Sequence, residues 1–323
     1  MKIETLSVFP HCYDSVMNES MMRIAQEKGY LDFTAHDLRD WTHDKHRTTD
    51  DEPYGGGQGL VMKCEPIFEA CDDLFAQSEE KPYVIFLSPT GEVFNDALTL
   101  ELARKPHLFF ICGHYEGIDE RVYSLADNVI SIGDYVLEEA CRQCRYWNEH
   151  GMPDFHINVN LSVVQLLQKD IVDTVAKVLK KTGVNPRNIV LEITESFAIN
   201  DMDRVLNIIN GIRELGPKIA LDDFGTGYSS LNYIKQLPFD IIKVDKTFID
   251  DITEDEYAQA FIKLIVELSA TIGTKIVVEG VEDKSQLDIL RELGVDFIQG
   301  YYYGKPEPAY EFERLNFKGR INI

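Results

Sequence analysis

From about residue 155 onward, the chain repeats one unit: a short apolar strand, a polar residue at the C-terminal end of that strand, and an amphipathic helix. The apolar strand segments lie at residues 155–160, 188–193, 218–222, 240–244, 275–279 and 296–299. Between them, apolar residues recur at helical spacing at residues 171–181, 204–215, 258–271 and 285–293. Because strands that alternate with helices form parallel sheets, this half of the chain predicts one.

Polar side chains end nearly every one of these strands. They are Asn160, Glu192, Asp222, Asp223, Lys243, Glu279 and Gln299. On a parallel barrel the C-terminal strand ends share one mouth, where the chemistry takes place. Carboxylate and amide oxygens are the ligands that Mg²⁺ and Mn²⁺ prefer, and two such ions can assist phosphoryl displacement. The strands are too few to close an eight-stranded barrel, so a partial barrel is predicted.

A simpler role for these acids is helix capping. Taken singly, Glu192, Asp222 or Glu279 could accept hydrogen bonds from the free amides of a helix N-terminus. Capping does not require a charged residue at the end of nearly every strand, so we favour a metal site for the set. The glycines at 225 and 227 indicate a turn, because no lysine follows them as a phosphate-binding loop would require.

Six ordered strings in this half resemble the signature series of EAL phosphodiesterases. They are VNLS (159–162), EITES (192–196), DDFGTGYSSL (222–231), IKVDKTFI (242–249), EGVE (279–282) and QGYYYGKP (299–306). The resemblance implies an EAL-type (β/α) barrel that hydrolyses one phosphodiester of cyclic di-GMP to give the linear dinucleotide. It also implies Mg²⁺ or Mn²⁺ as cofactor.

The resemblance assigns a role to each strand-end residue. The metal ligands would be Asn160, Glu192, Asp222 and Asp223. The catalytic pair would be Lys243, which holds the attacking water or a phosphate oxygen, and Glu279, which acts as a further ligand or a base. On the substrate side, Glu282 would support the loop at 222–231, and Gln299 would line the substrate site.

One departure from the EAL pattern bears on activity. The Glu-Ala-Leu motif that names the family should precede Gly133 and is absent. The nearest acid is Glu101 in LELA, which lies in a segment that resembles another family, and we interpret that match as coincidence. Because the missing Glu would complete the metal site, we expect the phosphodiesterase to be impaired.

Residues 1–137 predict a second, separate α/β sheet. Strands are expected at 3–9, 83–87, 108–112 and 128–132, a helix at about 15–28, and a polar stretch from 37 to 58. The strings DKHRTTDDEPYGGGQGLVMKCEPIFEA (44–70), IFLSPTGEVFN (85–95), ICGHYEGIDERV (111–122) and ISIGDYVL (130–137) resemble bacterial tRNA (guanine-N1)-methyltransferases of the knotted SPOUT class. That resemblance implies a pocket for S-adenosylmethionine.

The residues that this resemblance places at the S-adenosylmethionine pocket are Ser88, Gly91, Gly113, Tyr115, Glu116, Gly117, Ile132, Gly133, Asp134, Tyr135, Val136 and Leu137. The helix that closes the SPOUT knot and the domain that contacts tRNA are missing, so we expect an incomplete knot. The glycines at 55–57 could equally form a plain loop, and their spacing to Gly59 excludes a dinucleotide fingerprint. Residues 119–121 are more typical of a solvated helix face.

The two resemblances meet at residues 133–137, where both families share nearly the same string. The chain therefore resembles a chimera, with a methyltransferase-like part at 1–137 and an EAL-like part at 138–323. A partial barrel leaves strand edges unpaired at 155–160. The N-terminal sheet could cover that edge with its strand at 128–132, or a homodimer could cover it.

Charge and composition restrict the partners. The net charge is -23, with 11 Lys and Arg against 25 Asp and Glu in residues 1–137, and 21 against 30 in the remainder. This argues against tRNA and anionic membranes, because phosphate binding relies on clustered Lys and Arg. With no leader or long apolar run, we expect a cytoplasmic protein. Cys141 and Cys144 have no second pair for zinc, so we expect two helix residues, one of them buried.

Three functions follow from the sequence. The first is a metal-dependent cyclic di-GMP phosphodiesterase, which requires the strand-end acids. The second is a methyltransferase-like part that binds S-adenosylmethionine. The third is an inactive nucleotide-binding chimera, which would bind cyclic di-GMP without turnover.

Overall fold

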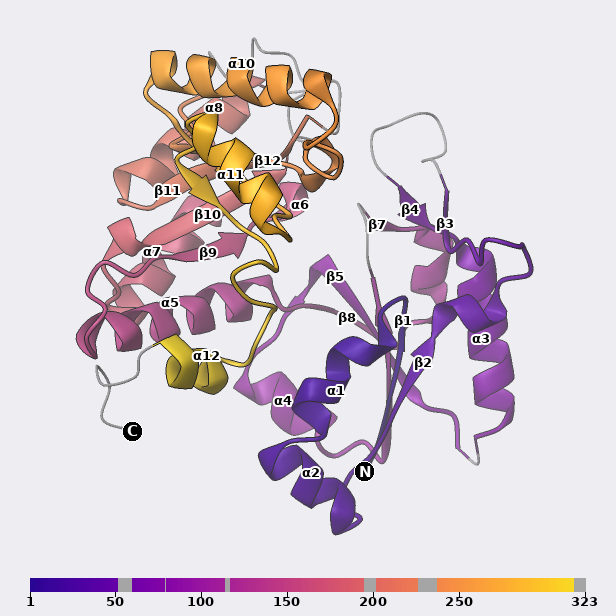
Figure 1. Ribbon diagram of the computed structural model, residues 1–323. Helices are drawn as coiled ribbons and strands as arrows, with labels where there is room; N and C mark the ends of the chain where they lie inside the picture. Colours follow the sequence, from indigo (N-terminus) through magenta and orange to yellow (C-terminus); the bar gives the residue numbers. More distant parts are fainter. Residues whose placement is uncertain (52–59, 79, 114–116, 195–201, 226–236, 317–323) are drawn as a thin grey trace. The chain divides into compact units, whose positions relative to one another are not determined.

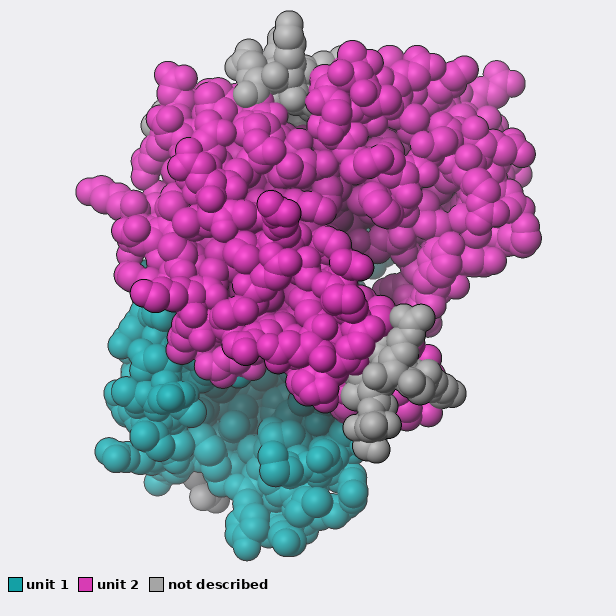
Figure 2. All heavy atoms as spheres, turned by 90° about the vertical axis from the view of Figure 1, so that its left-hand side faces the viewer, with its two compact units in different colours: residues 1–135 teal, residues 136–323 magenta. Residues whose placement is uncertain are grey.

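The structure is a computed structural model that describes residues 1–51, 60–78, 80–113, 117–194, 202–225 and 237–316 (Figure 1). The chain forms two compact units, Met1–Tyr135 and Val136–Ile323, which we call unit 1 and unit 2 (Figure 2). In the described ranges, no helix is both long enough and apolar enough to cross a bilayer.

Unit 1 is built on a five-stranded parallel sheet with the order β2-β1-β6-β5-β8. The strands are β1 (Lys2–Ser7), β2 (Asp32–Asp37), β5 (Tyr83–Val93), β6 (His107–Cys112) and β8 (Asn128–Ser131). A small second sheet joins β3 (Asp50–Asp51), β4 (Val61–Met62) and β7 (Gly117–Ile118). The short 3₁₀ helices of this unit are η1 (Pro10–Tyr13), η2 (Leu38–Trp41) and η3 (Glu120–Leu125).

Helices cover both faces of the five-stranded sheet. Successive strand residues point to opposite faces, so Phe86 and Phe109 pack with Ile67 of α3 (Cys64–Ala76). Their neighbour Ile85 packs on the other side with Leu98 of α4 (Asp96–Leu102). A parallel sheet buried on both faces explains why these strands read as continuous apolar runs.

One expectation for unit 1 is wrong, and one strand was missed. The helix expected at 15–28 is two helices, α1 (Asp14–Met17) and α2 (Ser20–Glu27), separated at a backbone turn where Ser20 has φ 44°. The strand β2 was not expected. The strand at 128–132 is β8, which pairs with β5 at one edge of the sheet of unit 1. Coverage of the edge at 155–160 by this strand stays a prediction.

Unit 2 is built on a six-stranded parallel sheet with the order β14-β13-β12-β11-β10-β9. The strands are β9 (Ile157–Asn160), β10 (Ile189–Thr194), β11 (Lys218–Phe224), β12 (Ile241–Val244), β13 (Lys275–Val278) and β14 (Phe297–Ile298). All six expected strands are present, and the sheet is part of a (β/α) barrel. Among the described residues, no strand lies beyond β9 or β14.

The helices of unit 2 follow the expected pattern. The four helices expected between the strands are α7 (Ile171–Thr182), α8 (Met202–Glu214), α10 (Glu256–Ile272) and α11 (Lys284–Glu292). The others are α5 (Gly133–Glu149), α6 (Val163–Leu166), α12 (Ala309–Asn316) and the 3₁₀ turns η4 (Pro186–Asn188) and η6 (Lys246–Phe248). Cys141 and Cys144 are both fully buried on α5, so the expectation that only one is buried is wrong.

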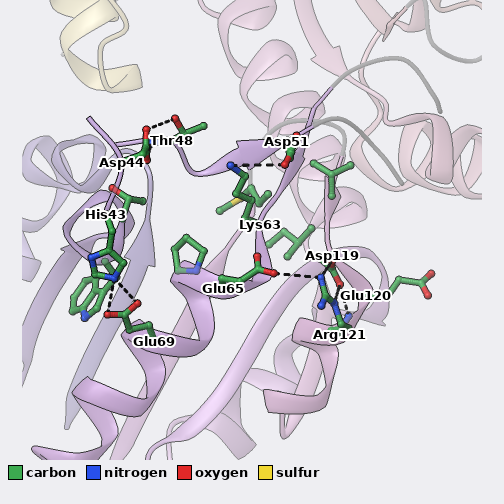
Figure 3. A pocket seen from close by; sticks show the side chains of 16 residues that line it. His43, Asp44, Thr48, Asp51, Lys63, Glu65, Glu69, Asp119, Glu120 and Arg121 are labelled. Atoms are coloured by element: carbon green, nitrogen blue, oxygen red, sulfur yellow. Dashed lines mark hydrogen bonds and ion pairs between the residues drawn. The ribbon is translucent and has the colours of Figure 1, made fainter. Parts of the chain in front are cut away.

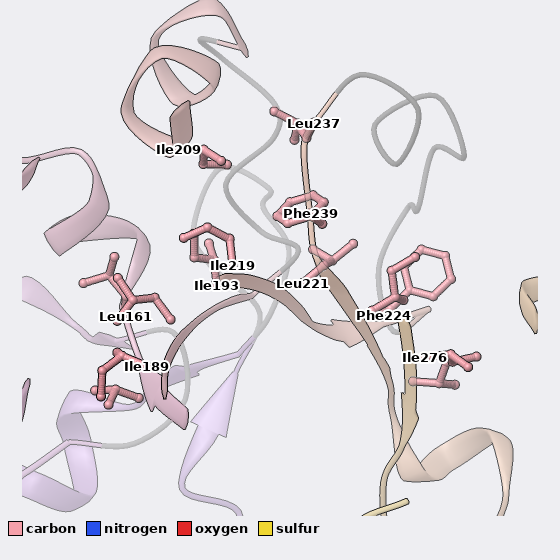
Figure 4. Close-up of a cluster of buried hydrophobic side chains, with 14 of the residues drawn as sticks. Leu161, Ile189, Ile193, Ile209, Ile219, Leu221, Phe224, Leu237, Phe239 and Ile276 are labelled. Carbon is pink, nitrogen blue, oxygen red and sulfur yellow. The ribbon is translucent and has the colours of Figure 1, made fainter. Parts of the chain in front are cut away.

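One apolar core joins the sheet of unit 2 to its helices. Ile193, Ile219 and Leu221 of the sheet lie near Ile209 of α8 in this cluster (Figure 4). Each such buried aliphatic side chain contributes about 1.5–3 kcal/mol relative to exposure. The helix ends are well formed: Gly273 with φ 77° ends α10, and Asp283 with Gln286 forms a capping box on α11.

Candidate functional site

The polar strand-end residues of unit 2 lie on the sheet face opposite the apolar core. On β10, Leu191 and Ile193 belong to the core, so Glu192 between them points to the other face. The parallel register places Asn160 beside Glu192, and Thr194 beside Asp222. The register of adjacent strands therefore brings side chains that are far apart in sequence to one end of the sheet.

Lys243 lies at the centre of this group. Its Nζ is 2.8 Å from Oε1 of Glu192, 2.7 Å from Oδ1 of Asp222 and 2.7 Å from Oε1 of Glu279. Lys243 is 3% exposed, Glu192 6% and Asp222 7%, so these charges are removed from water. A buried charge is tolerated only when it is paired, and here one ammonium has three acidic partners.

The pKa directions reflect this imbalance. Burial by itself would lower the pKa of Lys243, but hydrogen bonds and charge attraction from Asp222 and Glu192 raise it above its usual value. For Glu279, burial raises the pKa, and the charges of Asp222 and Glu192 raise it further against the lowering by Lys243. The site therefore holds more negative charge than one lysine neutralises.

The donor set fits a divalent cation. Carboxylate oxygens of Asp222, Asp223 and Glu279 lie within 4.8 Å of one another, and all come from the C-terminal ends of strands. Asp223 has φ 53°, a left-handed conformation that is uncommon for a residue other than glycine. Such backbone strain is often found at functional sites, and oxygen-only donors of this kind suit Mg²⁺ or Mn²⁺.

The turn after β13 also places Glu279. Gly280 has φ 76°, and a Cβ at this position would lie 2.3 Å from Cβ of Lys246. Only glycine fits this turn without displacing its neighbour. Directly before this turn, the amide of Glu279 donates to the carbonyl oxygen of Val244 at 3.0 Å, and its side chain contacts Lys243.

The helix-capping alternative does not describe these acids. Glu192 and Asp222 lie within strands, and the side chains of both contact Lys243. The side chains that cap helices in unit 2 belong to other residues. Among the described residues they are Ser162, Asn185, Asp245, Asp255 and Asp283.

The remaining predicted residues of unit 2 lie at the border of the cluster. Asn160 and Gln299 are exposed, at the ends of β9 and β14. Glu282 is exposed, and its amide donates to Oε1 of Gln286 at 2.8 Å. The loop at 226–231 that Glu282 is expected to support lies outside the described residues. The roles of these three residues stay predictions.

Sequence reasoning missed Asn158. Its Nδ2 donates to Oε1 of Glu192 at 2.7 Å, the same oxygen that contacts Lys243. The available signal was strand periodicity: Asn158 is two residues before Asn160 and therefore shares its face of β9.

In unit 1, the expected cofactor residues lie near the C-terminal ends of three adjacent strands. Ser88 and Gly91 are in β5, Gly113 directly follows β6, and Ile132 directly follows β8. Oγ of Ser88 is 2.8 Å from the hydroxyl of Tyr123. A Cβ on Gly91 would lie 2.5 Å from the backbone of Ile130, so the strands approach closely there.

The other expected cofactor residues are divided between different elements. Gly117 is in β7, whereas Tyr115 and Glu116 lie outside the described residues. The remainder form the first turn of α5: Gly133, Asp134, Tyr135, Val136 and Leu137.

A surface pocket of about 900 Å³ lies elsewhere in unit 1 (Figure 3). It is lined by residues after η2, by the start of α3 and by residues 119–121, and it contains none of the expected cofactor residues. Its charged groups pair with one another: Nε2 of His43 lies 2.9 Å from Glu69, and Arg121 lies 2.7 Å from Asp119. The guanidinium of Arg121 holds the pKa of Asp119 at about 2.

Two family models match the chain. The EAL domain model matches residues 119–306, and the tRNA (Guanine-1)-methyltransferase TrmD model matches residues 1–141. Both resemblances found in the sequence are thus confirmed, and the relatives divide between the same two families, as expected of a chimera-like chain.

Curated relatives show the same division. The bifunctional diguanylate cyclase/cyclic di-GMP phosphodiesterase MucR of Pseudomonas aeruginosa is 38% identical over 223 residues, which cover 69% of this chain and 32% of MucR. A tRNA (guanine-N(1)-)-methyltransferase of Anoxybacillus flavithermus is 50% identical over 138 residues, which cover 42% of this chain and 56% of that protein. The chain thus spans about a third of the length of MucR and about half of the length of the methyltransferase.

A solved structure of the PaMucR phosphodiesterase in complex with c-di-GMP has a TM-score of 0.54 and 42% identity, and the match covers 56% of this chain and 73% of that chain. An EAL domain protein from Listeria monocytogenes has a TM-score of 0.53 and 33% identity, and covers 58% of this chain and 73% of that chain. Because the EAL model covers more than half of its residues, the chain belongs to the EAL domain family.

Proposed function

We propose that unit 2 hydrolyses one phosphodiester bond of cyclic di-GMP to give the linear dinucleotide, with Mg²⁺ or Mn²⁺ as cofactor. The observation that carries this proposal is the convergence of Glu192, Asp222 and Glu279 on one buried lysine, with Asp223 beside them. The similarity to a phosphodiesterase structure in complex with c-di-GMP supports the choice of substrate.

Hydrolysis requires that a water oxygen bonds to phosphorus, that one ester P–O bond breaks, and that the departing oxygen gains a proton. A divalent cation held by the acids would polarise the phosphate and activate the water. In this proposal Lys243 holds the attacking water or a phosphate oxygen, which requires that one of its three N–H donors exchanges a carboxylate for that oxygen. Glu279, whose pKa burial raises, is suited to accept the proton from water.

We expect the rate to be limited by an incomplete ligand set. Glu101, the nearest acid to the missing motif, is exposed on α4 in unit 1. Within the described part of the sheet, β9 is an edge strand, and no further strand supplies a carboxylate beside Asn160. The cluster would therefore act with one ligand fewer than the family pattern implies.

The test is to incubate the purified chain with cyclic di-GMP and Mn²⁺ and to separate the nucleotides by chromatography. Linear product that requires metal, that is lost in Asp222→Ala and that is kept in Asp203→Ala, an exposed acid on α8, would support the proposal. Thermal unfolding of the variants confirms that they fold. Absence of product in the parent chain contradicts the proposal, and binding of cyclic di-GMP without turnover would instead support the inactive nucleotide-binding alternative.

For unit 1 we propose binding of S-adenosylmethionine, the methyltransferase-like alternative. The observation in its favour is that Ser88, Gly91, Gly113 and Ile132 lie near the C-terminal ends of adjacent parallel strands, where α/β sheets bind ligands. Calorimetric titration with S-adenosylmethionine should show saturable binding that Asp222→Ala does not change. Absence of binding heat and of any thermal stabilisation would contradict this proposal.

A further inference from the structure

Two asparagines on β9 have different environments on the same face of the strand. Asn158 and Asn160 alternate with the buried Val159, so both side chains lie on the face that carries Glu192. The register places Asn160 directly beside Glu192, and Asn158 beside Val190. Among the described residues, the side chain of Asn160 has no hydrogen-bond partner, whereas that of Asn158 has one.

The partner of Asn158 is Glu192. Its Nδ2 lies 2.7 Å from Oε1 of Glu192, and Nζ of Lys243 lies 2.8 Å from the same oxygen. Because this carboxylate already accepts from an ammonium, the amide of Asn158 must present its nitrogen as donor. Both donors thus contact Oε1, and no described residue donates to Oε2 of Glu192.

The contact matters because Glu192 is only 6% exposed, so water does not replace a lost donor easily. Asn158 itself is exposed on an edge strand, so its side chain contributes little to the core. Asn158 therefore adds little to packing, but it is hydrogen-bonded to the buried Glu192. This combination favours a role in orienting that carboxylate over a role in stabilising the fold.

We infer that Asn158 is a positioning residue that orients the carboxylate of Glu192 for cation binding. This inference rests on the proposed function, because it assumes that Glu192 ligates the metal. Residues that orient metal ligands through hydrogen bonds typically contribute about 10–100-fold to metal affinity. Asn158 thus acts through Glu192, and the unpartnered Asn160 stays available as a ligand.

The experiment is calorimetric titration of Mn²⁺ into the full chain and three variants, with thermal unfolding of each. Asn158→Ala removes the donor, Asn158→Gln keeps an amide donor, and Asn207→Ala removes an exposed asparagine on α8 as the matched control. We expect Asn158→Ala to bind Mn²⁺ at least about tenfold more weakly, and Asn158→Gln and the control to bind nearly as the parent does. All unfolding midpoints should agree.

Three outcomes would overturn the inference. Asn158→Ala could bind Mn²⁺ as the parent does, Asn158→Gln could bind as weakly as Asn158→Ala, or the loss of affinity could accompany a fall in the unfolding midpoint, which would indicate a structural role. A parent chain that binds no Mn²⁺ is a different result, because it overturns the proposed function and this inference together.

Discussion

Each unit buries one charged side chain among several hydrogen-bonding partners, but the sign of the central charge is reversed. In unit 1, Glu4 is 5% exposed, and its carboxylate lies 2.9 Å from Nζ of Lys2, 3.0 Å from Nε2 of His36 and 2.6 Å from Nε2 of His107. In unit 2, Lys243 is 3% exposed and has three carboxylates at 2.7–2.8 Å. One acid surrounded by donors contrasts with one donor surrounded by acids.

The two clusters differ in whether the charged groups are balanced by their partners. Burial would raise the pKa of Glu4, but hydrogen bonds from Lys2, His36 and His107 lower it below its usual value. In unit 2, Glu279 keeps a raised pKa despite its contact with Lys243. The cluster of unit 1 is complete as it stands, whereas the cluster of unit 2 retains negative charge that a second cation would neutralise.

The largest effect should follow from removing the central charge of unit 2. Lys243→Met leaves three acids close together without their cation, and breaking a buried ion pair in this way costs about 3–5 kcal/mol. Urea unfolding measures this loss, and added Mn²⁺ should recover part of it. Lys284→Met, which breaks an exposed pair with Asp288, should change stability by less than about 1 kcal/mol. Equal effects of the two substitutions would refute the distinction between the sites.

Removing the central charge of unit 1 should have the next largest effect. Glu4→Gln replaces a buried carboxylate that has three hydrogen-bonding partners by a neutral amide. This should lower the free energy of unfolding by about 1–3 kcal/mol at pH 7. Because the folded-state pKa of Glu4 is lowered, its contribution is present above the unfolded value of 4.5 and is lost as the pH falls through the folded value. Urea unfolding at pH 7 and in acid should therefore show the difference from the parent shrink. A difference in the free energy of unfolding that grows in acid would contradict the lowered pKa of Glu4.

Glu279→Gln should behave in the opposite way. The folded-state pKa of Glu279 is raised, so its contribution to stability is present below the unfolded value of 4.5 and is lost as the pH rises through the folded value. At pH 7 without metal, Glu279→Gln should cost less stability than Glu4→Gln, since it removes one of the excess charges. Parallel urea unfolding of the two variants checks the order, and a larger loss for Glu279→Gln would contradict the excess of negative charge around Lys243.

The last comparison concerns the reactivity of the thiols. Cys12 in unit 1 is exposed, whereas Cys141 and Cys144 in unit 2 are buried, which raises their pKa to about 12 and about 11. Because the thiolate is the reactive form, alkylation at pH 8 should modify Cys12 at least about a hundredfold faster. Mass spectrometry of the labelled peptides measures the rates, and similar rates would indicate that α5 opens in the folded state.

Hydrophobic periodicity was sufficient to predict most of unit 2. Strands β9 to β14 and helices α7, α8, α10 and α11 match because each strand or helix packs against its neighbours along the chain. The sequence did not reveal β2 or the break between α1 and α2. In β2 the alternation is masked by polar residues, such as His36, whose partners come from distant strands.

The site was predictable only in part, for the same reason. Three residues of the site lie near the C-terminal ends of strands, so a parallel topology was enough to predict that they lie close together. They are Asp222, Lys243 and Glu279. The contact between Asn158 and Glu192 depends on the register of β9 against β10, which no local pattern contains. Likewise, Glu4 and His107 are 103 residues apart, and only the pairing of β1 with β6 brings them together.

The central claim is that the acids around Lys243 require a divalent cation, and binding of Mn²⁺ tests it most directly. Electron paramagnetic resonance of free Mn²⁺ should show saturable binding to the parent chain and to Asp203→Ala, and loss of that binding in a folded Asp222→Ala variant. Binding that is equal in all three chains would assign the cation to another site, and no binding to the parent would show that Lys243 alone satisfies the cluster.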